Sequence, residues 1–400
     1  MQGRVVVAAL LAAAMLNSCG LSGSGAMALP PASTQSLGAN ATQGATFEPA
    51  KTYALFMGVL EWKDPDLEPF PKEDRADRAL ERTLLARGVP KDHIIFLEDR
   101  QATLKNAWKA LADIKAKMAP GSTLLIYFAG HGIRERGVTW LANHDIDLKR
   151  LPQTGLALSE LTKRLIKDWR GERLLLLADC CYSGALAEVV QAVGAKGIKA
   201  ASLSSVSPTD GSTERWTFTE SLVRAWTGET RLDLNGDRRV SFAETDTYIH
   251  DQMKYGEEQL THGSRAGGFE PEWQFSTAAS VPPPAVGQSR WSVGDYAESQ
   301  SQGKWERVQV LSQSQNSAFV HFLTRADRFD ASVPADGLRA VPPTRFTNSQ
   351  RVQVEYDGKW ETARIQQSAE GFFHFVHYET LDDSDEWVTD KRLRKIGGTR

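Results

Sequence analysis

Two short apolar runs, 50 residues apart, constrain this 400-residue chain more than any other feature. They read IYFAGHG at residues 126–132 and LADCCYSG at residues 177–184. Each has the composition of a buried strand and ends in a turn of small residues that carries an imidazole or a thiol. Parallel strands present their functional groups at their carboxyl ends, so neighbouring strands would bring these groups together. A histidine beside a cysteine is the minimum apparatus of a cysteine nucleophile.

The chain between residues 50 and 278 alternates between strand and helix patterns. This alternation predicts a doubly wound α/β domain, in which a mostly parallel sheet is covered on both faces. Strands are predicted at residues 53–60, 93–97, 123–129, 173–178 and 198–204, and helices at residues 76–88, 103–118, 158–169 and 185–193.

The two motifs resemble those of the caspase and metacaspase clan of cysteine peptidases. The match comprises the first predicted strand, the GHG turn at 130–132, the D-x-C-x-S-G block at 179–184 and the spacing between histidine and cysteine. The resemblance implies a caspase-like fold and a peptidase chemistry that needs no cofactor. It assigns Cys181 as the nucleophile and His131 as general base and acid. Backbone N–H groups of Gly132 and Cys181 would form the oxyanion hole.

Cys180 is the competing thiol. The D-x-C register of the resemblance selects Cys181, and the alternation of side chains along a strand end agrees with this choice. A helix predicted from Ala185 would favour the Cys181 thiolate at its amino-terminal end. The opposing interpretation is that His131 caps a turn and both cysteines fill the core, as free cysteines usually do.

Asp179 is the most informative residue for specificity, again through the resemblance. Metacaspases carry aspartate here to receive arginine or lysine before the scissile bond, whereas caspases that cut after aspartate carry glutamine. A carboxylate binds guanidinium through two hydrogen bonds and ammonium as a point charge. Asp77 falls near the second acidic pocket residue of metacaspases, with Asp74 as a close competitor. Ala129 replaces a serine that metacaspases often have, and Asp179 has the alternative role of ordering its turn.

Residues 233–244, with the sequence DLNGDRRVSFAE, match an EF-hand calcium loop. Position six, where the loop turns sharply, holds Arg238 instead of glycine, and a non-glycine residue at positive φ costs about 1–2 kcal/mol. The sequence therefore predicts either a weakened Ca²⁺ site or a loop that keeps its shape without the ion. The predicted ligands are Asp233, Asn235, Asp237, the Arg239 carbonyl, Ser241 and Glu244.

An internal repeat with a period near 55 residues follows a proline-rich linker at 279–289. GKWE at 303–306 recurs at 358–361, and FVHF at 319–322 recurs as FVHY at 375–378. The alternating apolar stretches predict two small β-barrels, at 290–341 and 345–397.

Each repeat resembles the Tudor, agenet and chromo-barrel group, whose eukaryotic members hold methylated cations in aromatic cages. In this chain the aromatic residues are predicted to form barrel core and strand faces instead, and the barrels to form a docking module whose ligand stays open. In the second repeat these residues are Tyr356, Trp360, Tyr378 and Trp387.

The amino-terminal segment predicts export from a bacterial cytoplasm, to the periplasm, a membrane anchor or the medium. An apolar run at 5–16 is too short to span a bilayer comfortably. Within the predicted signal peptide at 1–28, cleavage before Cys19 would give a lipid-anchored protein, whereas ordinary cleavage would follow Ala28. Residues 29–49 are predicted to form a flexible tether.

Charge and cysteine content exclude several classes of protein. The net charge of −3 gives no reason to expect nucleic acid as a partner. Three cysteines, two of them adjacent, offer no disulfide framework. The sequence predicts an exported cysteine endopeptidase that cleaves after basic residues. Two other classes stay open, a catalytically silent scaffold and an envelope-binding protein that acts through its barrels.

Overall fold

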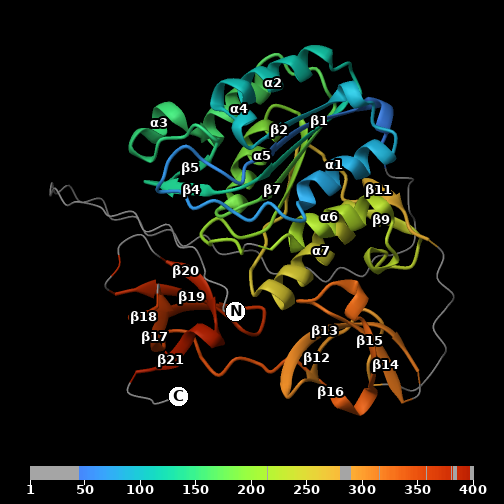
Figure 1. The fold of residues 1–400 in the computed structure, drawn as a ribbon, viewed down its shortest axis with the longest axis vertical. Coiled ribbons are helices and arrows are strands. Elements are labelled where there is room, and N and C mark those ends of the chain that lie inside the picture. The colour runs from blue at the N-terminus through green and yellow to red at the C-terminus, as the bar shows by residue number, and fades with distance from the viewer. Residues whose placement is uncertain are drawn as a thin grey trace.

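The computed structural model describes residues 45–213, 215–279, 290–314, 316–356, 358–379, 381 and 385–396. These form an α/β domain and two curled β-sheets, which we call the first barrel and the second barrel (Figure 1). The predicted signal peptide with Cys19 and Ala28, the tether up to residue 44 and the linker from residue 280 lie outside the described residues.

A six-stranded sheet forms the centre of the α/β domain, in the order β10-β8-β7-β3-β1-β2. Only the edge strand β10 runs antiparallel to its neighbour, so the predicted mostly parallel sheet is confirmed. The central strands β1, β3 and β7 are buried along their whole length, as expected for parallel strands covered on both faces. The strands are β1 (Thr52–Gly58), β2 (Ile94–Glu98), β3 (Thr123–Ala129), β7 (Arg173–Asp179), β8 (Lys199–Ser204) and β10 (Ser264–Ala266).

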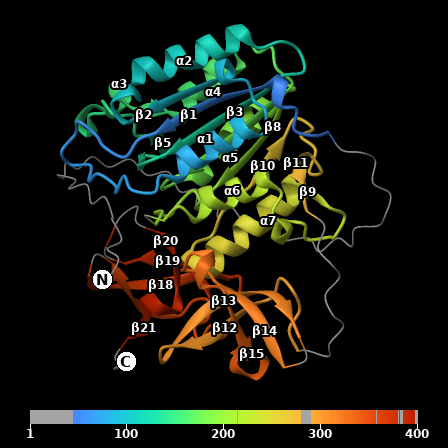
Figure 2. The ribbon, with the colours of Figure 1, turned by 45° about the vertical axis from the view of Figure 1, so that its right-hand side comes forward.

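Helices cover both faces of this sheet, and alternate residues of β1 enter two separate cores (Figure 2). Leu55 and Met57 pack on one side with α2 (Leu104–Lys117), α4 (Leu158–Ile166) and α5 (Leu186–Gly194). Ala54 and Phe56 pack on the other side with α1 (Ala76–Ala86), α6 (Thr217–Thr227) and α7 (Phe242–Gln252). The described helices include none that is both long enough and apolar enough to cross a membrane.

Several elements of the α/β domain were not predicted from the sequence. Beyond β3 lies a small antiparallel sheet of β4, β5 and β6, and a second one joins β9 to β11. These elements, with the short helix α3, are β4 (Gly132–Glu135), β5 (Val138–Leu141), α3 (Leu151–Thr154), β6 (Leu156–Ala157), β9 (Arg239–Ser241) and β11 (Gln274–Thr277).

The predicted carboxyl-terminal boundary of the tether, at residue 49, is wrong, because the last residues of that segment belong to the α/β domain. Phe47 is 8% exposed, and its N–H donates to the Gln274 carbonyl at 2.8 Å. Its ring meets those of Trp226 and Trp273 edge-on. The few apolar residues at the end of the polar stretch therefore belong to the core, because burying an aromatic side chain outweighs the cost of ordering its neighbours.

The two barrels have the same topology, as the repeat predicted. The first has the strand order β15-β14-β13-β12-β16 and the second β20-β19-β18-β17-β21, both antiparallel. Each has a β-bulge at the same place, near Val310 and near Ile365. The strands are β12 (Tyr296–Ser301), β13 (Lys304–Gln313), β14 (Ser317–Phe322), β15 (Ala331–Pro334), β16 (Leu338–Arg339), β17 (Arg351–Tyr356), β18 (Lys359–Ala369), β19 (Phe373–Tyr378), β20 (Glu386–Thr389) and β21 (Leu393–Lys395).

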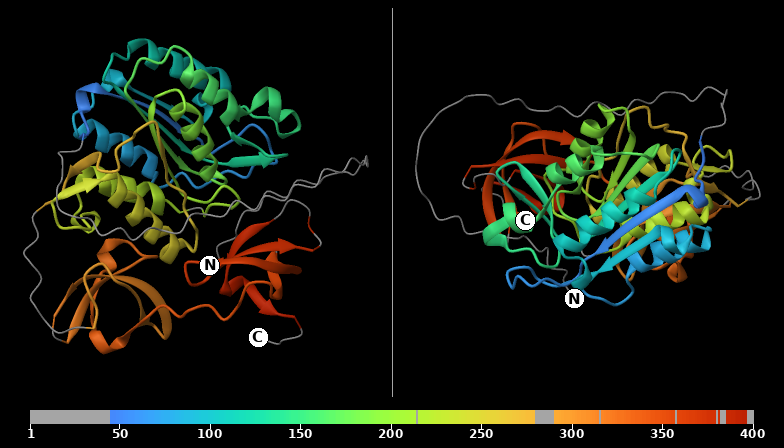
Figure 3. Two further views of the ribbon diagram at one scale, coloured as in Figure 1. Left: turned by 180° about the vertical axis from the view of Figure 1, so that it is seen from behind. Right: turned by 90° about the horizontal axis from the view of Figure 1, so that it is seen from above.

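Both barrels lie on one side of the α/β domain and contact the end of α7 and the π-helix Met253–Glu257 that follows it (Figure 3). Tyr255 stacks on Tyr296 of the first barrel with ring centroids 4.4 Å apart. Lys254 pairs with Glu370 of the second barrel at 3.0 Å. One segment of the α/β domain therefore carries contacts to both repeats.

Candidate functional site

The turn after β3 places His131 at the carboxyl end of the sheet. Gly130 has φ of 150°, and a Cβ atom at this position would lie 2.7 Å from the Val59 carbonyl oxygen. Only glycine fits such a close approach of two backbones. The next residue, His131, is buried.

The imidazole of His131 is held in one orientation. Its ring contacts those of Trp62 and Phe70, with both centroid distances at 4.4 Å, and Nε2 is 2.8 Å from the Glu68 carbonyl oxygen. A carbonyl can only accept, so Nε2 carries the hydrogen and Nδ1 of the neutral ring keeps a free lone pair. Burial lowers the pKa of His131 and so favours the neutral ring. The hydrogen bond and charge of Glu68 raise this pKa by a smaller amount. The site therefore offers Nδ1 as a base.

These three partners of His131 were missed in the sequence. They lie on the segment between β1 and α1, which has no recognisable motif. The decisive contact is a main-chain carbonyl, that of Glu68, and any residue type supplies one. The aromatic residues Trp62 and Phe70 were the available signal, since two large rings in a loop usually cover something.

The turn after β7 separates the two adjacent thiols. Cys180 is 1% exposed within the core beside α5, whereas Cys181 is half-buried. The Sγ of Cys181 accepts from the Ser212 N–H at 3.2 Å. Burial raises the pKa of the Cys181 thiol, opposed by the N–H groups of Ser212, Cys181 itself and Gly132. Cys181 is the thiol that faces a set of backbone donors.

The helix that was predicted to begin at Ala185 and to favour the Cys181 thiolate begins later than predicted. Residues Ser183–Ala185 form a single 3-10 turn, and α5 begins only at Leu186. Tyr182 has φ of 57°, so the chain turns sharply directly after Cys181. The donors around Sγ therefore come from loops and the GHG turn, because this left-handed residue prevents the helix from starting earlier.

The two motifs meet directly. Ala129 pairs with Asp179 at the ends of β3 and β7, and a Cβ atom on Gly132 would lie 1.8 Å from the Cys181 carbonyl oxygen. The backbone N–H groups predicted to form an oxyanion hole, those of Gly132 and Cys181, both act on the thiol. The imidazole turn and the thiol turn thus form one site at the carboxyl edge of the sheet.

Asp179 is a buried carboxyl group beside this site. Its Oδ2 accepts from the Thr219 hydroxyl at 2.6 Å, and that hydroxyl also meets the Tyr127 hydroxyl at 2.7 Å. Burial raises the pKa of Asp179 to about 7, opposed by the hydroxyls of Thr219 and Ser205. The hydrogen-bond partners described for Asp179 are uncharged. A cation bound beside Asp179 would therefore stabilise its ionised form.

Asp77 has a different environment. It is fully buried and pairs with Arg75 at 2.7 Å, and it also accepts from the Arg78 N–H. Arg75 in turn reaches Asp99 and the Gly58 carbonyl, next to the end of β1. The competitor Asp74 is exposed. The charge of Asp77 is therefore already compensated within the chain.

Replacement of Asp77 by asparagine is expected to destabilise the protein by about 1–3 kcal/mol, because the buried Arg75 guanidinium loses its pair with Asp77 and keeps only those with Glu98 and Asp99. The matched control is Asp74→Asn, an exposed position at positive φ that asparagine tolerates, with an expected change within about 0.5 kcal/mol. Chemical denaturation measures both. Equal stability of the two variants would show that the Arg75–Asp77 pair does not hold this region.

The EF-hand-like loop at residues 233–244 has the sharp turn that the motif predicts at position six. Arg238 at position six has φ of 68°, the conformation for which glycine is usual. The carboxyl groups of Asp233, Asp237 and Glu244 each offer an oxygen within 4.8 Å of the others. Oδ1 of Asp233 is buried and has no hydrogen-bond partner among the described residues.

Several of the predicted calcium ligands also make hydrogen bonds that order the loop. Glu244 accepts from the Ser241 N–H and hydroxyl and from the Leu234 N–H, while Asn235 accepts from the Asp237 N–H at 2.8 Å. Arg239, whose carbonyl was predicted as a ligand, begins β9. An orphaned buried carboxylate oxygen within such an acidic loop fits a hard cation such as Ca²⁺.

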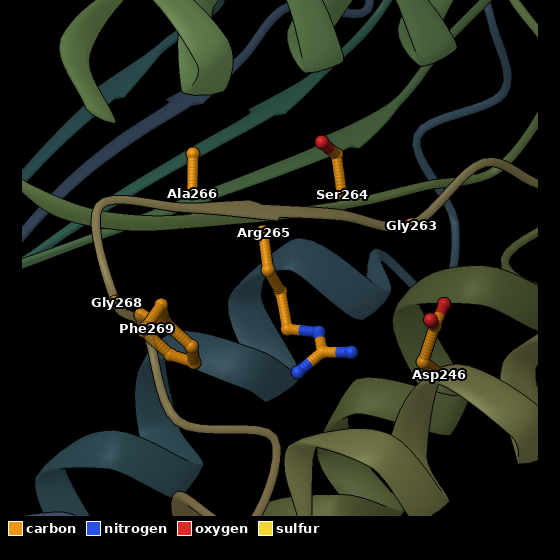
Figure 4. A pocket seen from close by; sticks show the side chains of 7 residues that line it. All are labelled: Asp246, Gly263, Ser264, Arg265, Ala266, Gly268 and Phe269. Atoms are coloured by element: carbon orange, nitrogen blue, oxygen red, sulfur yellow. The ribbon is translucent and has the colours of Figure 1, made fainter. Parts of the chain in front are cut away.

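Two cavities lie apart from the thiol. The first, about 500 Å³, is bounded by Asp246 and by the segment around β10, with the Arg265 and Asp246 side chains on its walls (Figure 4). Burial raises the pKa of Asp246 to about 6, opposed by Arg265. The second, about 740 Å³, lies between α1, α6 and the first barrel. Neither lining includes His131 or Cys181.

An arginine side chain of the same barrel lies over each of two equivalent tryptophans. The Arg339 guanidinium lies 3.8 Å from the Trp305 ring centroid, and that of Arg394 lies 4.0 Å from the Trp360 ring. Each arginine comes from the last strand of its barrel, 55 residues from its counterpart. These indole faces therefore already make the cation–π contact that an aromatic cage would offer to a ligand.

The other aromatic residues of the second barrel are packed. Tyr378 lies in the barrel core and Tyr356 meets it edge-on at 5.3 Å. Trp387 belongs to a small apolar cluster with Leu260 of the α/β domain and Phe372. Trp387 therefore lies where the second barrel meets the α/β domain.

Comparison with known proteins gives structural likeness alone. No protein-family model and no curated sequence matches this chain. The solved structure of protein GSU0716 from Geobacter sulfurreducens is 16% identical, with a TM-score of 0.42, over 57% of this chain and 100% of that one. The Drosophila initiator caspase Dronc is 9% identical, with a TM-score of 0.37, over 60% of this chain and 90% of that one.

The carboxyl-terminal part has its own structural neighbours. An agenet domain pair of the Arabidopsis thaliana protein AGDP1 is 15% identical, with a TM-score of 0.14, over 26% of this chain and 81% of that one. Strand order and register define the fold class: a mostly parallel α/β sheet followed by two small all-β barrels.

Proposed function

We propose that this protein is a cysteine endopeptidase that hydrolyses peptide bonds after arginine or lysine. The observation that carries the proposal is the junction of two strand ends. There an imidazole fixed through Nε2 by the Glu68 carbonyl lies on the turn that contacts Cys181, whose thiol faces backbone N–H donors. A positioned base, a thiol and preorganised donors are the components of acyl transfer.

The reaction would proceed in two steps on the Cys181 thiol. Nδ1 of His131 takes the thiol proton, and the thiolate attacks the scissile carbonyl carbon while the N–H groups of Gly132 and Cys181 donate to the developing oxyanion. Collapse forms a thioester, and the leaving amine takes the proton from the imidazolium. His131 then deprotonates a water molecule that hydrolyses the thioester and restores the thiol. The scheme needs no cofactor.

Asp179 would bind the basic side chain before the scissile bond. Its carboxyl has a pKa of about 7 because of burial, and its described partners are hydroxyls and backbone. A guanidinium or ammonium group would stabilise the ionised form. Asp77 would act indirectly, by holding Arg75 at the end of β1.

One observation favours a second candidate, a catalytically silent scaffold or envelope-binding protein that acts through its barrels. Burial raises the Cys181 pKa, which disfavours the reactive thiolate. Peptide reporters that end in arginine or lysine separate the candidates. The peptidase turns both over, whereas the scaffold turns over neither and is unaffected by Cys181→Ala.

We also propose that the acidic loop binds Ca²⁺ weakly, and that Arg238 is the cause of the weakness. Calorimetric titration with Ca²⁺ alone should detect binding in the wild type, and Arg238→Gly should tighten it, because the variant removes a positive charge beside the acidic ligands. Glu244→Gln removes a charged ligand and should abolish binding. If Ca²⁺ fails to bind even the Arg238→Gly variant, the loop is purely structural.

Export is the remaining part of the proposal. It is supported by the apolar run at residues 5–16 and by the two cleavage sequences that end at Ser18 and Ala28. The mass of the mature protein distinguishes a lipidated chain starting at Cys19 from one starting at Leu29.

A further inference from the structure

The loop at residues 205–213, which follows β8, contacts the nucleophile and both of its neighbours. The Cys180 N–H donates to the Ser205 hydroxyl at 3.2 Å, and the Tyr182 N–H donates to the Asp210 carbonyl at 2.9 Å. Between them, Sγ of Cys181 accepts from the Ser212 N–H. The position of this loop therefore decides whether the thiol has that donor.

The opposite side of the 205–213 loop contacts the second barrel. Oδ1 of Asp210 accepts from the Trp387 N–H at 3.0 Å, and its Oδ2 accepts from the Ser207 hydroxyl at 2.8 Å. Trp387 lies on β20, the edge strand of the barrel, so its N–H is free of the sheet and available to another segment. Asp210 is only 7% exposed, which makes its hydrogen bonds costly to lose.

Other contacts seat the second barrel independently of this loop. Glu370 pairs with Lys254 at 3.0 Å and Lys391 pairs with Glu258 at 2.5 Å. Phe372 and Phe373 pack with Leu260. The barrel is therefore fixed on the α/β domain at several points, and Asp210 is where its position reaches the 205–213 loop.

Charged groups of the second barrel and of β4 lie at the junction. Glu386 and Arg392 of the second barrel face Asp210, and Arg134 of β4 donates to the Pro208 carbonyl at 2.7 Å. Gln259 donates to the Gly211 carbonyl. The loop is thus held from the barrel, from β4 and from the segment after the π-helix.

We propose that Asp210 is a positioning residue through which the second barrel holds the 205–213 loop, and with it the Ser212 N–H, against the Cys181 thiol. The barrel then sets the reactivity of the thiol, and a ligand that draws the barrel away from the α/β domain changes that reactivity. The proposal rests on the proposed function only in treating Cys181 as the reacting thiol.

The pH dependence of alkylation by iodoacetamide tests this without any peptide substrate. The thiolate displaces iodide, so the midpoint of the rate against pH reports the pKa of Cys181, and peptide mapping separates its label from that of Cys180. Relative to Asp210→Asn, which removes the same charge, Asp210→Ala should shift the midpoint upwards by about one pH unit, because the thiolate loses a hydrogen-bond donor. Asp210→Asn removes the negative charge that raises the Cys181 pKa but keeps an oxygen that can accept from the Trp387 N–H, so it should lower the midpoint slightly.

A second pair of variants tests the role of the barrel itself. Glu370→Lys with Lys391→Glu places like charges opposite Lys254 and Glu258, and reversing those two residues as well restores both pairs. Hydrogen exchange of the peptide that contains Trp387 reports whether the barrel has moved. The two-residue variant should expose this amide and raise the alkylation midpoint, and the four-residue variant should reverse both effects.

Three results would overturn the inference. The first is an exposed Trp387 amide with an unchanged midpoint, and the second is a raised midpoint with the amide still protected. The third is an equal shift in Asp210→Ala and Asp210→Asn. Failure to cleave any peptide, with the midpoints shifting as expected, would instead contradict the peptidase and leave the link between barrel and thiol intact.

Discussion

Replacement of Cys181 by alanine is expected to lower kcat/KM for peptides that end in arginine or lysine by roughly 10⁴-fold or more. Alanine offers no group that can form the thioester, and the remaining backbone donors give only residual catalysis. Fluorogenic reporter peptides measure the loss, and thermal unfolding shows whether the variant is folded.

The adjacent thiol provides the matched control. Cys180 is 1% exposed in the core, so Cys180→Ala is expected to cost about 1 kcal/mol of stability and to change kcat/KM by less than about threefold. Turnover that survives in Cys181→Ala, or falls equally in both variants, would contradict the assignment of the nucleophile.

Asp179→Asn is expected to lower kcat/KM for an arginine-ended peptide by about 10²–10³-fold, because the basic side chain loses its charged partner in a buried site. A peptide that ends in citrulline, the uncharged analogue of arginine, should be affected much less. The ratio of the two kcat/KM values isolates the pocket, since both substrates use the same thiol and imidazole. A ratio that Asp179→Asn leaves unchanged would remove Asp179 from the pocket.

The same ratio is expected to depend on pH in the wild type. The pKa of Asp179 is raised by burial to about 7, and in the proposed pocket the ionised form would bind the cation. Preference for arginine over citrulline should therefore rise as the pH increases through about 7 and level off above it. The Asp179→Asn variant should show a low ratio at every pH, since asparagine does not titrate.

Stability should change in the opposite sense to activity. Between its ordinary pKa of 3.8 and about 7, the Asp179 carboxyl binds more protons in the folded protein than in the unfolded chain. The free energy of unfolding therefore falls as the pH rises through this window and stays lower above it. At about pH 8 the asparagine variant should be more stable than the wild type by up to roughly 4 kcal/mol, and at about pH 3 the two should be equal.

Local patterns predicted the central strands because burial leaves a strong signal. Strand β3 spans the residues expected, and β7 exceeds its prediction only by Asp179. Helices α6 and α7 and the β4–β5 hairpin were missed. In the hairpin each strand has only four residues, and buried and exposed residues are grouped along it instead of alternating, so the sequence has no period-two pattern there.

Contacts between distant segments account for the rest of what sequence reasoning missed. Asp77 was predicted to lie in the pocket, but Arg75, two residues away, neutralises it. The Glu68 carbonyl and the Ser212 N–H are backbone groups, which any residue type supplies. The bond from Trp387 to Asp210 spans 177 residues and depends on how the second barrel is seated. Residue patterns describe one element at a time and contain no information about such docking.

The repeat illustrates the same limit. Its period predicted that two copies of one fold would follow the α/β domain, and the strand orders of the two barrels agree. It did not reveal that the first copy contacts α6 through Asp327 and Arg224, whereas the second contacts the 205–213 loop. Surface residues that differ between copies decide the docking, and their partners lie elsewhere in the chain.

The most direct test of the peptidase is mass spectrometry of the new peptide ends formed when a denatured proteome is digested by the wild type and by Cys181→Ala. The account predicts ends that follow arginine or lysine in the wild-type digest and are absent with the variant. Ends that appear equally with both proteins, or that follow acidic or apolar residues, would contradict it.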